Sequence, residues 1–393
     1  MQFTLENIGK IRSAEITIDG FTVLAGENCT GKSTIGKALF AIYNSFSRQD
    51  EKIRNYRREA VNSRLWFSRR MASNIEERIL SQKQITAEEL RELLSDVETS
   101  LRPLDLDATA EHLNQVIAVT DDELREVLLR TMLNAEFENQ LLNVFTELPG
   151  SMHLRVGKHT VQVSCPFAAK IEYSGAIPQT LDDALYIDDI PDPSIRCSLP
   201  AGHKNSLRRA LYNRRETNIV DEAIQEGVSD QISELLTSVC DGRLVRTAPY
   251  RFVYQTGGKE IAFVNVSSGL RMFVALKTLI QKGALKRGGL LIMDEPEVHL
   301  HPKWQIIFAE ILVLLQRALN LRILLSTHSH YFISALKTYA QYHKIENPYR
   351  FYLLDENEEG TIDAVDVTDD TEPIYKKLVA PLQTLENVEY PDD

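Results

Sequence analysis

One motif near the start of the chain constrains its fold more than any other feature. Residues 26–34 read GENCTGKST and fit the pattern G-x-x-x-x-G-K-[ST]. The apolar run 21–25 precedes the motif, as a buried strand would, and a helical pattern begins at 33. A strand, a glycine-containing loop and a helix in this order form a phosphate-binding loop, because backbone N–H groups and the helix N-terminus surround the phosphate. We expect Lys32 to hold phosphate and the Ser33 hydroxyl to bind Mg²⁺.

A second apolar run ends in two adjacent carboxylates. Residues 290–293 read LLIM and are followed by Asp294 and Glu295. A continuous apolar run is typical of a central strand that is covered on both faces. We expect Asp294 to hold Mg²⁺ and Glu295 to act as the general base on the attacking water. Solvated acids at a strand end would give the same local pattern, but the phosphate-binding loop favours the catalytic interpretation.

Two weaker motifs lie on either side of this strand in the sequence. Small residues at 267–269 precede a helical pattern, and such residues at a helix N-terminus form either an anion site or a simple cap. The apolar residues 324–325 lead through 326–327 to His328, which could contact a γ-phosphate. A lone histidine at a strand end is more often structural, so the order of all four motifs decides the interpretation.

In that order, the motifs resemble those of an ABC-type ATPase head of the SMC/RecF/OLD-like branch. They would be Walker A at 26–33, a signature loop at 266–270, Walker B at 290–295, a D-loop at 296–302 and a switch residue, His328. The run 294–305, DEPEVHLHPKWQ, resembles that of stand-alone bacterial "AAA family" ATPases, many of them in anti-phage defence. The resemblance covers about 1–45 and 246–340. It implies an α/β P-loop NTPase fold of ABC type, ATPase activity, and ATP and Mg²⁺ as cofactors.

The resemblance also implies how the site residues divide between two subunits. Such heads dimerise head to tail, and ATP is sandwiched between the Walker loops of one head and the signature loop of the other. The nucleotide-binding residues of one head would be Gly26, Asn28, Gly31, Lys32, Ser33 and Thr34. The residues that reach the partner's nucleotide would be Ser267, Ser268 and Gly269. Glu295 and His328 would be catalytic, and Ser33 and Asp294 would hold the metal.

The chain departs from the family pattern in three places. Ser268 stands where the signature L-S-G-G-Q has its first glycine, and Cys29 stands where the Walker loop of SMC proteins usually has glycine. The third departure is that no glutamine can be placed in a Q-loop. These departures bear on the rate and regulation of hydrolysis more than on ATP binding.

The chain divides by pattern into two strand–helix sections around a different stretch. Residues 1–48 and 246–393 are predicted to form the ATPase head, and 49–245 a mainly helical insertion with some strands. Helical spacing is found at 86–100, 108–118 and 121–146, and near 219–240, with β-like alternation at about 152–175. Thr86 with Glu89 and Thr120 with Glu123 fit capping boxes. No heptad run is long enough for a coiled-coil arm.

The charge balance argues against a protein that coats nucleic acid. The formal net charge is −12, from 44 Lys+Arg and 56 Asp+Glu. Basic residues nevertheless gather at 52–78 and 204–215, where they could contact a nucleic acid or an acidic partner, or form solvated helix faces. The candidate contact residues are Arg54, Arg57, Arg58, Arg69, Arg70, Arg208 and Arg209.

Composition excludes several other classes of protein. The chain has no apolar run of the length that spans a membrane and no secretory signal, so we expect a cytoplasmic protein without membrane contact. The 4 cysteines are far apart and form no CxxC pair, which argues against a disulfide framework or a cysteine zinc site. The acidic tail, 351–370, is predicted to be a hairpin rather than a nuclease centre.

These patterns together predict an ATPase that works as a switch. ATP would close two heads into a homodimer or a higher homo-oligomer, hydrolysis would release them, and the insertion would transmit the change. By resemblance, the chain would be the sensor or regulatory subunit of a bacterial anti-phage system with a separate effector protein. Two alternatives stay open: a RecF-like repair ATPase that binds DNA directly, and a scaffold that assembles on ATP with little turnover.

Overall fold

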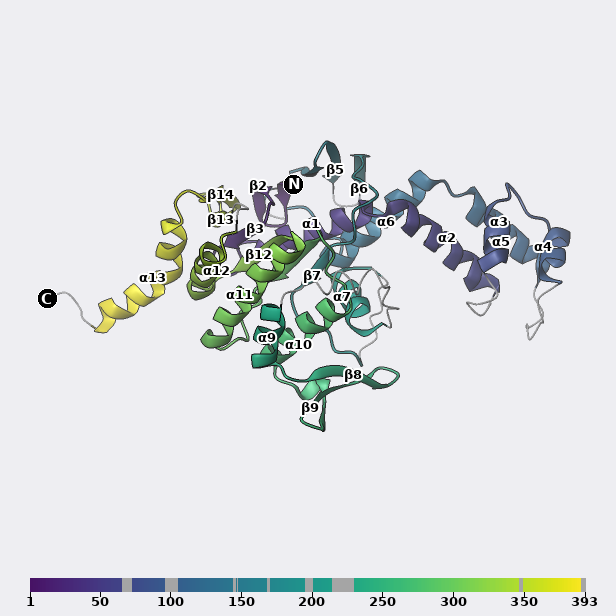
Figure 1. The fold of residues 1–393 in the computed structure, drawn as a ribbon. Helices are drawn as coiled ribbons and strands as arrows, with labels where there is room; N and C mark the ends of the chain where they lie inside the picture. Colours follow the sequence, from purple (N-terminus) through teal and green to yellow (C-terminus); the bar gives the residue numbers. More distant parts are fainter. Residues whose placement is uncertain are drawn as a thin grey trace.

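The computed structural model describes the chain except for residues 66–72, 96–104, 144–145, 147, 168–169, 195–200, 214–229, 346–348 and 390–393. At its centre is an 11-stranded mixed sheet in the order β6-β5-β4-β1-β2-β14-β13-β3-β12-β11-β7 (Figure 1). The parallel part consists of β13 (Tyr349–Glu356), β3 (Phe21–Ala25), β12 (Arg322–Thr327), β11 (Leu290–Asp294) and β7 (Leu185–Ile187). The remaining strands extend the sheet on the β13 side, mostly in antiparallel pairs.

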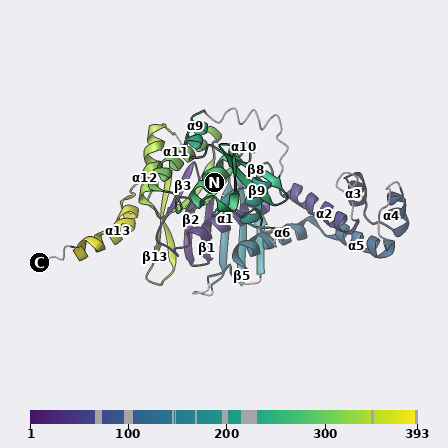
Figure 2. The ribbon, with the colours of Figure 1, turned by 90° about the horizontal axis from the view of Figure 1, so that it is seen from below.

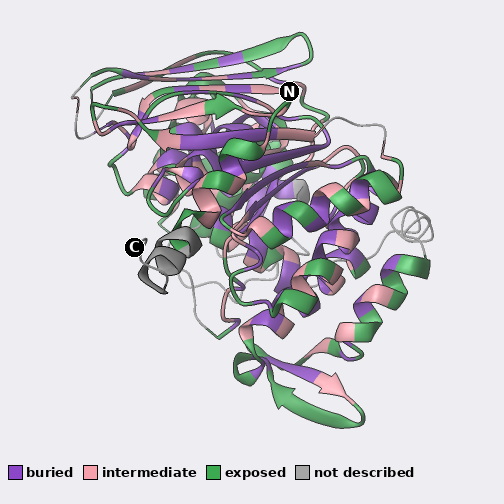
Figure 3. Ribbon diagram, turned by 90° about the vertical axis from the view of Figure 1, so that its left-hand side faces the viewer, coloured by how far each residue is buried: buried purple, intermediate pink, exposed green. Residues whose placement is uncertain are grey.

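The parallel strands are buried because helices cover both of their faces. One core contains Val23, Met293 and Leu325 together with α10 (Ser268–Gln281), α11 (Pro302–Leu319) and α12 (His330–Tyr342). The other core contains Leu24, Ile292 and α1 (Lys32–Phe46). Neighbouring residues of one strand thus enter opposite cores, as the pleat of a strand requires. Figure 3 shows the buried strands between helices whose outer sides are exposed. The prediction of a central strand at 290–293 is confirmed.

The antiparallel part combines the start of the chain with a later segment. β1 (Gln2–Ile8) pairs with β2 (Ile11–Thr17) and with β4 (Gly150–Val156). β5 (His159–Phe167) and β6 (Lys170–Gly175) continue the sheet outward from β4. Their buried side chains join the core around α1 and α6 (Asp121–Phe137).

Four helices project from one end of the sheet and form what we call the helical arm. It consists of α2 (Gln49–Leu65), α3 (Ser73–Leu80), α4 (Ala87–Leu94) and α5 (Leu106–Ala118) (Figures 1 and 2). The arm has a small core of its own, in which Val61, Leu90 and Leu113 are buried. Helix α6 then leads the chain back to the sheet and packs along α1. Both predicted capping boxes are present, at the starts of α4 and α6.

The structure divides residues 49–245 differently from the prediction of one mainly helical insertion. Strands β4 to β7, at 150–187, belong to the same sheet as the strand of the phosphate-binding loop. Helix α6 ends at Phe137 rather than near 146, because Glu138 adopts a left-handed conformation with φ of 48°. Helix α9 (Asp230–Val239) forms the last part of the helix expected at 219–240, and 219–229 lie outside the described residues.

The remaining elements lie at the edges of the head. β8 (Arg243–Ala248), β9 (Arg251–Thr256) and β10 (Lys259–Ala262) form a small antiparallel sheet. The tail hairpin, β13 with β14 (Ile362–Asp366), is also confirmed and precedes α13 (Glu372–Glu389), which lies at the opposite end from the arm (Figure 2). Among the helices in the described ranges, none is both long and apolar enough to cross a bilayer.

Candidate functional site

The predicted phosphate-binding loop connects β3 to α1, and its backbone is tightly shaped. Gly31 is left-handed, with φ of 81°, and the Thr30 hydroxyl donates a hydrogen bond to the Glu27 carbonyl over 2.8 Å. A Cβ at Gly26 would lie 2.8 Å from the Leu354 carbonyl oxygen, so only glycine fits there. Cys29 is also left-handed, with φ of 64°, at the position where the family pattern has glycine. The loop opens into a hollow lined by Lys10, Asn28, Cys29, Thr30, Gly31, Lys32, Ser33, Thr34 and Glu295.

Lys32 is the buried cation of this loop. Its side chain is 4% exposed, and its ammonium donates hydrogen bonds to the carbonyls of Gly26, over 2.9 Å, and Glu27, over 2.7 Å. The same nitrogen lies 3.6 Å from Oε1 of Glu295. The loop at the end of β3 and the carboxylate after β11 are therefore brought together, as the sequence predicted.

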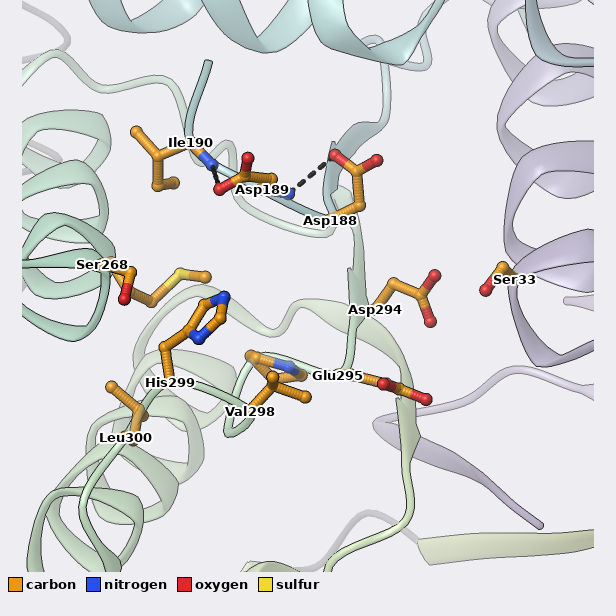
Figure 4. A pocket seen from close by; sticks show the side chains of 12 residues that line it. Ser33, Asp188, Asp189, Ile190, Ser268, Asp294, Glu295, Val298, His299 and Leu300 are labelled. Carbon is orange, nitrogen blue, oxygen red and sulfur yellow. Dashed lines mark hydrogen bonds between the residues drawn. The ribbon is translucent and has the colours of Figure 1, made fainter. Parts of the chain in front are cut away.

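Asp294 ends β11 between two hydroxyl donors. The Ser326 hydroxyl, on the neighbouring strand β12, donates to its Oδ1, and the Tyr186 hydroxyl, on β7, donates to its Oδ2 over 3.2 Å. Burial, together with the negative charge of Asp294, raises the pKa of Tyr186 well above its usual value, so the phenol stays a neutral donor. The Asp294 carboxylate faces the side on which Ser33 lies (Figure 4).

Glu295 lies where two cationic or potentially cationic groups meet. Its Oε1 is 3.6 Å from the Lys32 ammonium and 3.3 Å from Nδ1 of His328, which follows β12. The backbone at Glu295 is left-handed, with φ of 46°, and its N–H donates to the Ser326 carbonyl over 3.0 Å. This turn directs Glu295 away from the strand while Asp294 stays in it. The predicted base and the predicted switch histidine are thus neighbours.

The carboxyl group of Glu297, which the sequence analysis did not single out, connects the loop after Walker B to the end of β12. Glu297 is 2% exposed and accepts hydrogen bonds from the Thr327 hydroxyl and, over 3.3 Å, from the backbone N–H of His328. Burial raises the pKa of Glu297. Its contacts join the D-loop to the end of β12, so the position of His328 depends on this loop. The E-P-E spacing after the strand was visible in the sequence, but nothing distinguished Glu297 from a solvated acid.

The signature loop begins helix α10 beside the D-loop. The Ser267 hydroxyl caps α10 by accepting a hydrogen bond from the Leu270 N–H over 3.4 Å, and Ser267 itself is exposed. Gly269 lies so close to the D-loop that an added Cβ would be 2.6 Å from the His299 carbonyl oxygen. Ser268 lines a cavity of about 250 Å³ that also contains His299 of the D-loop and Asp294 (Figure 4).

Two further acids at this cavity were not singled out from the sequence. Asp188 and Asp189 follow β7, which pairs in parallel with the Walker B strand. Ile187 is the register partner of Met293. Asp188 follows Ile187 and Asp294 follows Met293, so the two acids come next on neighbouring strands. Both line the cavity that contains Ser33 (Figure 4). A strand of 3 residues leaves almost no periodic signal, which is why this acidic pair could not be placed.

Three of the candidate arginines in the basic clusters make contacts within the chain. Arg57 donates to the Val119 carbonyl and to Asp121, each over 2.7 Å, and Arg58 contacts Glu77. Arg208 donates to the carbonyls of Asp192 and Pro193.

Only part of the basic surface remains for other partners. Arg54 and Arg209 are exposed, and Arg209 lines a groove at the base of the arm that also contains Lys52, Asp182 and Asp183. The mixed charge of this groove does not favour a polyanion. Arg69 and Arg70 lie outside the described residues.

The residues present fit magnesium bound together with a nucleotide. No group of three or more His, Cys, Asp or Glu side chains in the described ranges is arranged to hold a metal alone. Mg²⁺ in nucleotide sites takes one or two protein oxygens and fills its shell with phosphate oxygens and water. Ser33 and Asp294, which share one cavity, supply such a pair of oxygens.

Comparison with known proteins identifies relatives of this chain. The family described as "AAA domain, putative AbiEii toxin, Type IV TA system" matches residues 21–334. The "Retron Vc95 probable ATPase" of Vibrio cholerae serotype O1 biovar El Tor is 28% identical over 156 residues, which are 36% of this chain and only 29% of that relative's length.

Solved SMC head domains are also similar to the chain. The head from Thermotoga maritima is 12% identical, with a TM-score of 0.40, and the match covers 93% of this chain and 98% of that one. The head derived from Pyrococcus furiosus, bound to the C-terminal domain of ScpA, is 10% identical, with a TM-score of 0.45, and the match covers 99% and 98%.

The family match begins at β3, which leads into the phosphate-binding loop, and extends past His328. It therefore contains every motif that builds the site, from the phosphate-binding loop through Walker B to the histidine. The chain therefore belongs to this AAA-domain family, and its phosphate-binding loop joins β3 to α1 within an α/β fold.

Proposed function

We propose that the protein binds ATP with Mg²⁺ and hydrolyses it, and that this cycle opens and closes a head-to-tail dimer. The observation that carries the proposal is the convergence of Lys32 and His328 on Glu295, with Ser33 and Asp294 beside them. These groups come from three different strand ends, so the fold rather than the sequence brings them together. Phosphoryl transfer needs such positioning and charge stabilisation more than covalent chemistry.

Each side chain has a defined part in this mechanism. Lys32 exchanges its carbonyl partners at Gly26 and Glu27 for phosphate oxygens, and the N-terminus of α1 adds the partial charge of its N–H groups. Ser33 and Asp294 hold Mg²⁺, which when bound neutralises charge on the phosphates. Glu295 accepts a proton from the attacking water. His328, next to Glu295, donates to the γ-phosphate and reports its presence to the D-loop through the contact with Glu297.

Exposed residues of the site support the proposed dimer. Ser267 of the signature loop, Asn28 of the phosphate-binding loop and His328 are all exposed to solvent. A complete site needs donors on both sides of the triphosphate, and one head supplies the phosphate-binding loop on one side only. A second head that presents Ser267 and Ser268 to the nucleotide would complete it.

The biological role that we propose is regulation in bacterial anti-phage defence. The family description refers to a toxin–antitoxin system, and the relative is named as the ATPase of a retron. In this role the chain would regulate an effector, which we propose to be a separate protein. Direct DNA binding has less support, because Arg57, Arg58 and Arg208 are occupied by contacts within the chain.

The deciding experiment is the mass of the purified protein with and without ATP and Mg²⁺. Glu295→Gln keeps the metal residues but removes the base, so it should trap the ATP-bound dimer, whereas the wild type should return to monomer as ATP is consumed. Lys32→Ala serves as a control that should neither bind ATP nor change mass. A wild type whose mass never responds to ATP contradicts the switch. A stable ATP-bound oligomer without turnover would instead identify a scaffold.

A further inference from the structure

A buried histidine joins two carboxyl groups that come from distant parts of the chain. Nδ1 of His203 lies 2.6 Å from Oε2 of Glu136, and Nε2 lies 2.9 Å from Oδ2 of Asp188. The backbone N–H of His203 also donates to Oε1 of Glu136 over 2.7 Å. The Glu136 side chain is 0% exposed and that of His203 is 7% exposed. We call Glu136, His203 and Asp188 the relay.

Aromatic rings pack against the histidine on two sides. Its ring stacks on Tyr186 with the centroids 4.5 Å apart and meets the edge of Phe40 at 6.1 Å. Tyr186 is the same residue whose hydroxyl donates to Asp294. Both oxygens of Asp188 have donors, since Oδ1 accepts from the Asp189 N–H over 2.7 Å. Asp188 is therefore fixed next to the Walker B carboxylate rather than free to rotate.

The relay connects three elements of different origin. Glu136 is in the last turn of α6, His203 begins α7 (His203–Tyr212), and Asp188 follows β7. The other end of α6 touches the helical arm, because Arg57 of α2 contacts Asp121 and the Val119 carbonyl. Helix α6 and the hydrogen bonds at its two ends therefore connect the arm to the cavity shared by Ser33 and Asp294.

A buried group of this kind is not needed for stability, because other side chains could supply as much. Desolvating two carboxylates and an imidazolium costs several kcal/mol per ion, and well-packed apolar side chains often stabilise as well or better. The relay instead places a carboxylate, which is 22% exposed and faces the cavity, in a position that depends on α6 and α7. In this position the Asp188 carboxylate could act on a ligand bound in the cavity.

We propose that Glu136 and His203 position Asp188 to orient the water shell of the Mg²⁺ in the proposed nucleotide site, and that they couple this site to the helical arm. The proposal rests on the proposed function. Asp188 does not replace Ser33 or Asp294 as a metal residue but acts beside them, and His203 is a positioning residue. By reciprocity, binding of metal and nucleotide orders the end of α6 as much as α6 orders the site.

The test measures metal binding apart from turnover. Asp188→Asn, His203→Gln and Glu136→Gln are compared with Lys204→Gln, because Lys204 is 63% exposed and lies 3.7 Å from the same Asp188 oxygen. A fluorescent ATP analogue in EDTA reports nucleotide binding without metal, and electron paramagnetic resonance of Mn²⁺ with the nucleotide reports metal binding. We expect metal-free affinities within about twofold of wild type, and Mn²⁺ affinities weakened about tenfold in the three relay variants, the scale of outer-sphere partners of metal sites.

Hydrogen exchange tests the coupling to the arm. In the wild type, Mg²⁺ with ATP should slow amide exchange in residues 129–137, the end of α6, and Asp188→Asn should abolish this slowing. Lys204→Gln should behave as wild type in both measurements.

The contradicting outcomes are distinct. If Asp188→Asn binds Mn²⁺ as tightly as the wild type, the relay is structural and the positioning role is wrong. If the wild type shows no slowing in α6, the coupling is wrong. Should His203→Gln not fold, Asp188→Asn decides the result, because its amide keeps the size of the carboxylate. A wild type that binds no nucleotide at all overturns the proposed function itself, and the relay proposal falls with it.

Discussion

Among single residues, Cys29 shows how the chain tolerates a departure from its family's pattern. The position requires a left-handed backbone, with φ of 64°, which costs an L-residue roughly 1–2 kcal/mol. Glycine would avoid that cost but lose about 0.4–1 kcal/mol through the greater freedom of its unfolded chain. The side chain is exposed, so little packing is at stake.

Cys29→Gly should therefore leave the protein as stable as the wild type or up to roughly 1.6 kcal/mol more stable. Nucleotide binding should be unchanged, because the loop uses backbone N–H groups at this point. Thermal unfolding followed by circular dichroism measures the difference. Cys29→Val is the matched control and should be less stable than the wild type, since a β-branched side chain disfavours the left-handed region. A destabilised Cys29→Gly would show that the thiol makes a contact of its own.

His203 predicts a pH dependence of stability. Burial opposes its protonation, but the hydrogen bonds and charges of Asp188 and Glu136 outweigh burial and raise its pKa to about 9, from 6.5. Because the folded pKa is the higher one, the stabilisation is complete below pH 6.5 and is lost as pH rises through 9. The titratable groups at the ring are Glu136 and Asp188, which bond to it, and Tyr186, which stacks on it; Lys204, on the same helix, lies near Oδ2 of Asp188.

The free energy of unfolding of the wild type should fall by about 3 kcal/mol more than that of His203→Gln between pH 6.5 and 9.5. Urea titrations of both proteins across this range give the difference directly, because other titrating groups are common to both. Parallel curves for the two proteins would mean that His203 is neutral when folded.

The helical elements differ in how closely they are tied to the main core. Helix α6 packs into the core around α1 and carries Glu136, whereas α4 is buried only in the small core of the arm. Each begins with a capping box, in which Thr120 or Thr86 accepts from a glutamate N–H over 3.2 Å. The same capping box thus stabilises a helix of the main core in one case and a helix of the small arm core in the other.

Thr120→Ala should cost about 1 kcal/mol of global stability, the usual value of a lost N-cap. Thr86→Ala should cost a similar amount only within the arm, so amide exchange should rise in 87–94 while the main urea transition stays in place. The pair serve as each other's control. A lower main transition in Thr86→Ala would show that the arm unfolds together with the sheet.

At the scale of elements, the sequence predicted those helices, strands and turns that have a local pattern of their own. The strands at 21–25 and 290–293, both caps and the tail hairpin carry their own periodicity or capping residues. The pairing of β4 with β1 does not, because it joins segments about 150 residues apart through backbone groups that every residue possesses.

The site residues that could not be predicted also lack a local pattern. Lys32, Asp294 and Glu295 belong to motifs with fixed spacing, and these meet as expected. Asp188, His203 and Glu136 share no spacing, since three separate elements bring them together. A lone histidine and scattered acids are indistinguishable in sequence from solvated residues, so only the fold shows that they are buried and paired.

For the whole molecule, the dimer that we propose depends on how the signature loop and the D-loop are held together. The signature helix α10 and the D-loop meet at Gly269, where a Cβ would lie 2.6 Å from the His299 carbonyl oxygen. The atoms nearest to this added Cβ belong to His299 and Leu300 and not to the phosphate-binding loop, so the contact would mainly shape the surface that faces a second head in the proposed dimer. ATP binding and dimerisation should therefore separate under a change at this point.

Gly269→Ala should bind ATP with nearly the wild-type affinity but fail to dimerise. The added methyl group has to push the D-loop backbone away, and Ser268 and His299 then no longer present one surface to the partner. Mass measurements in the Glu295→Gln background give a clear readout, because that variant alone should be a stable dimer with ATP. Ala275→Gly, farther along the same helix, controls for a general loss of helix stability of about 1 kcal/mol. A Gly269→Ala protein that dimerises normally would place the dimer seam elsewhere on the head.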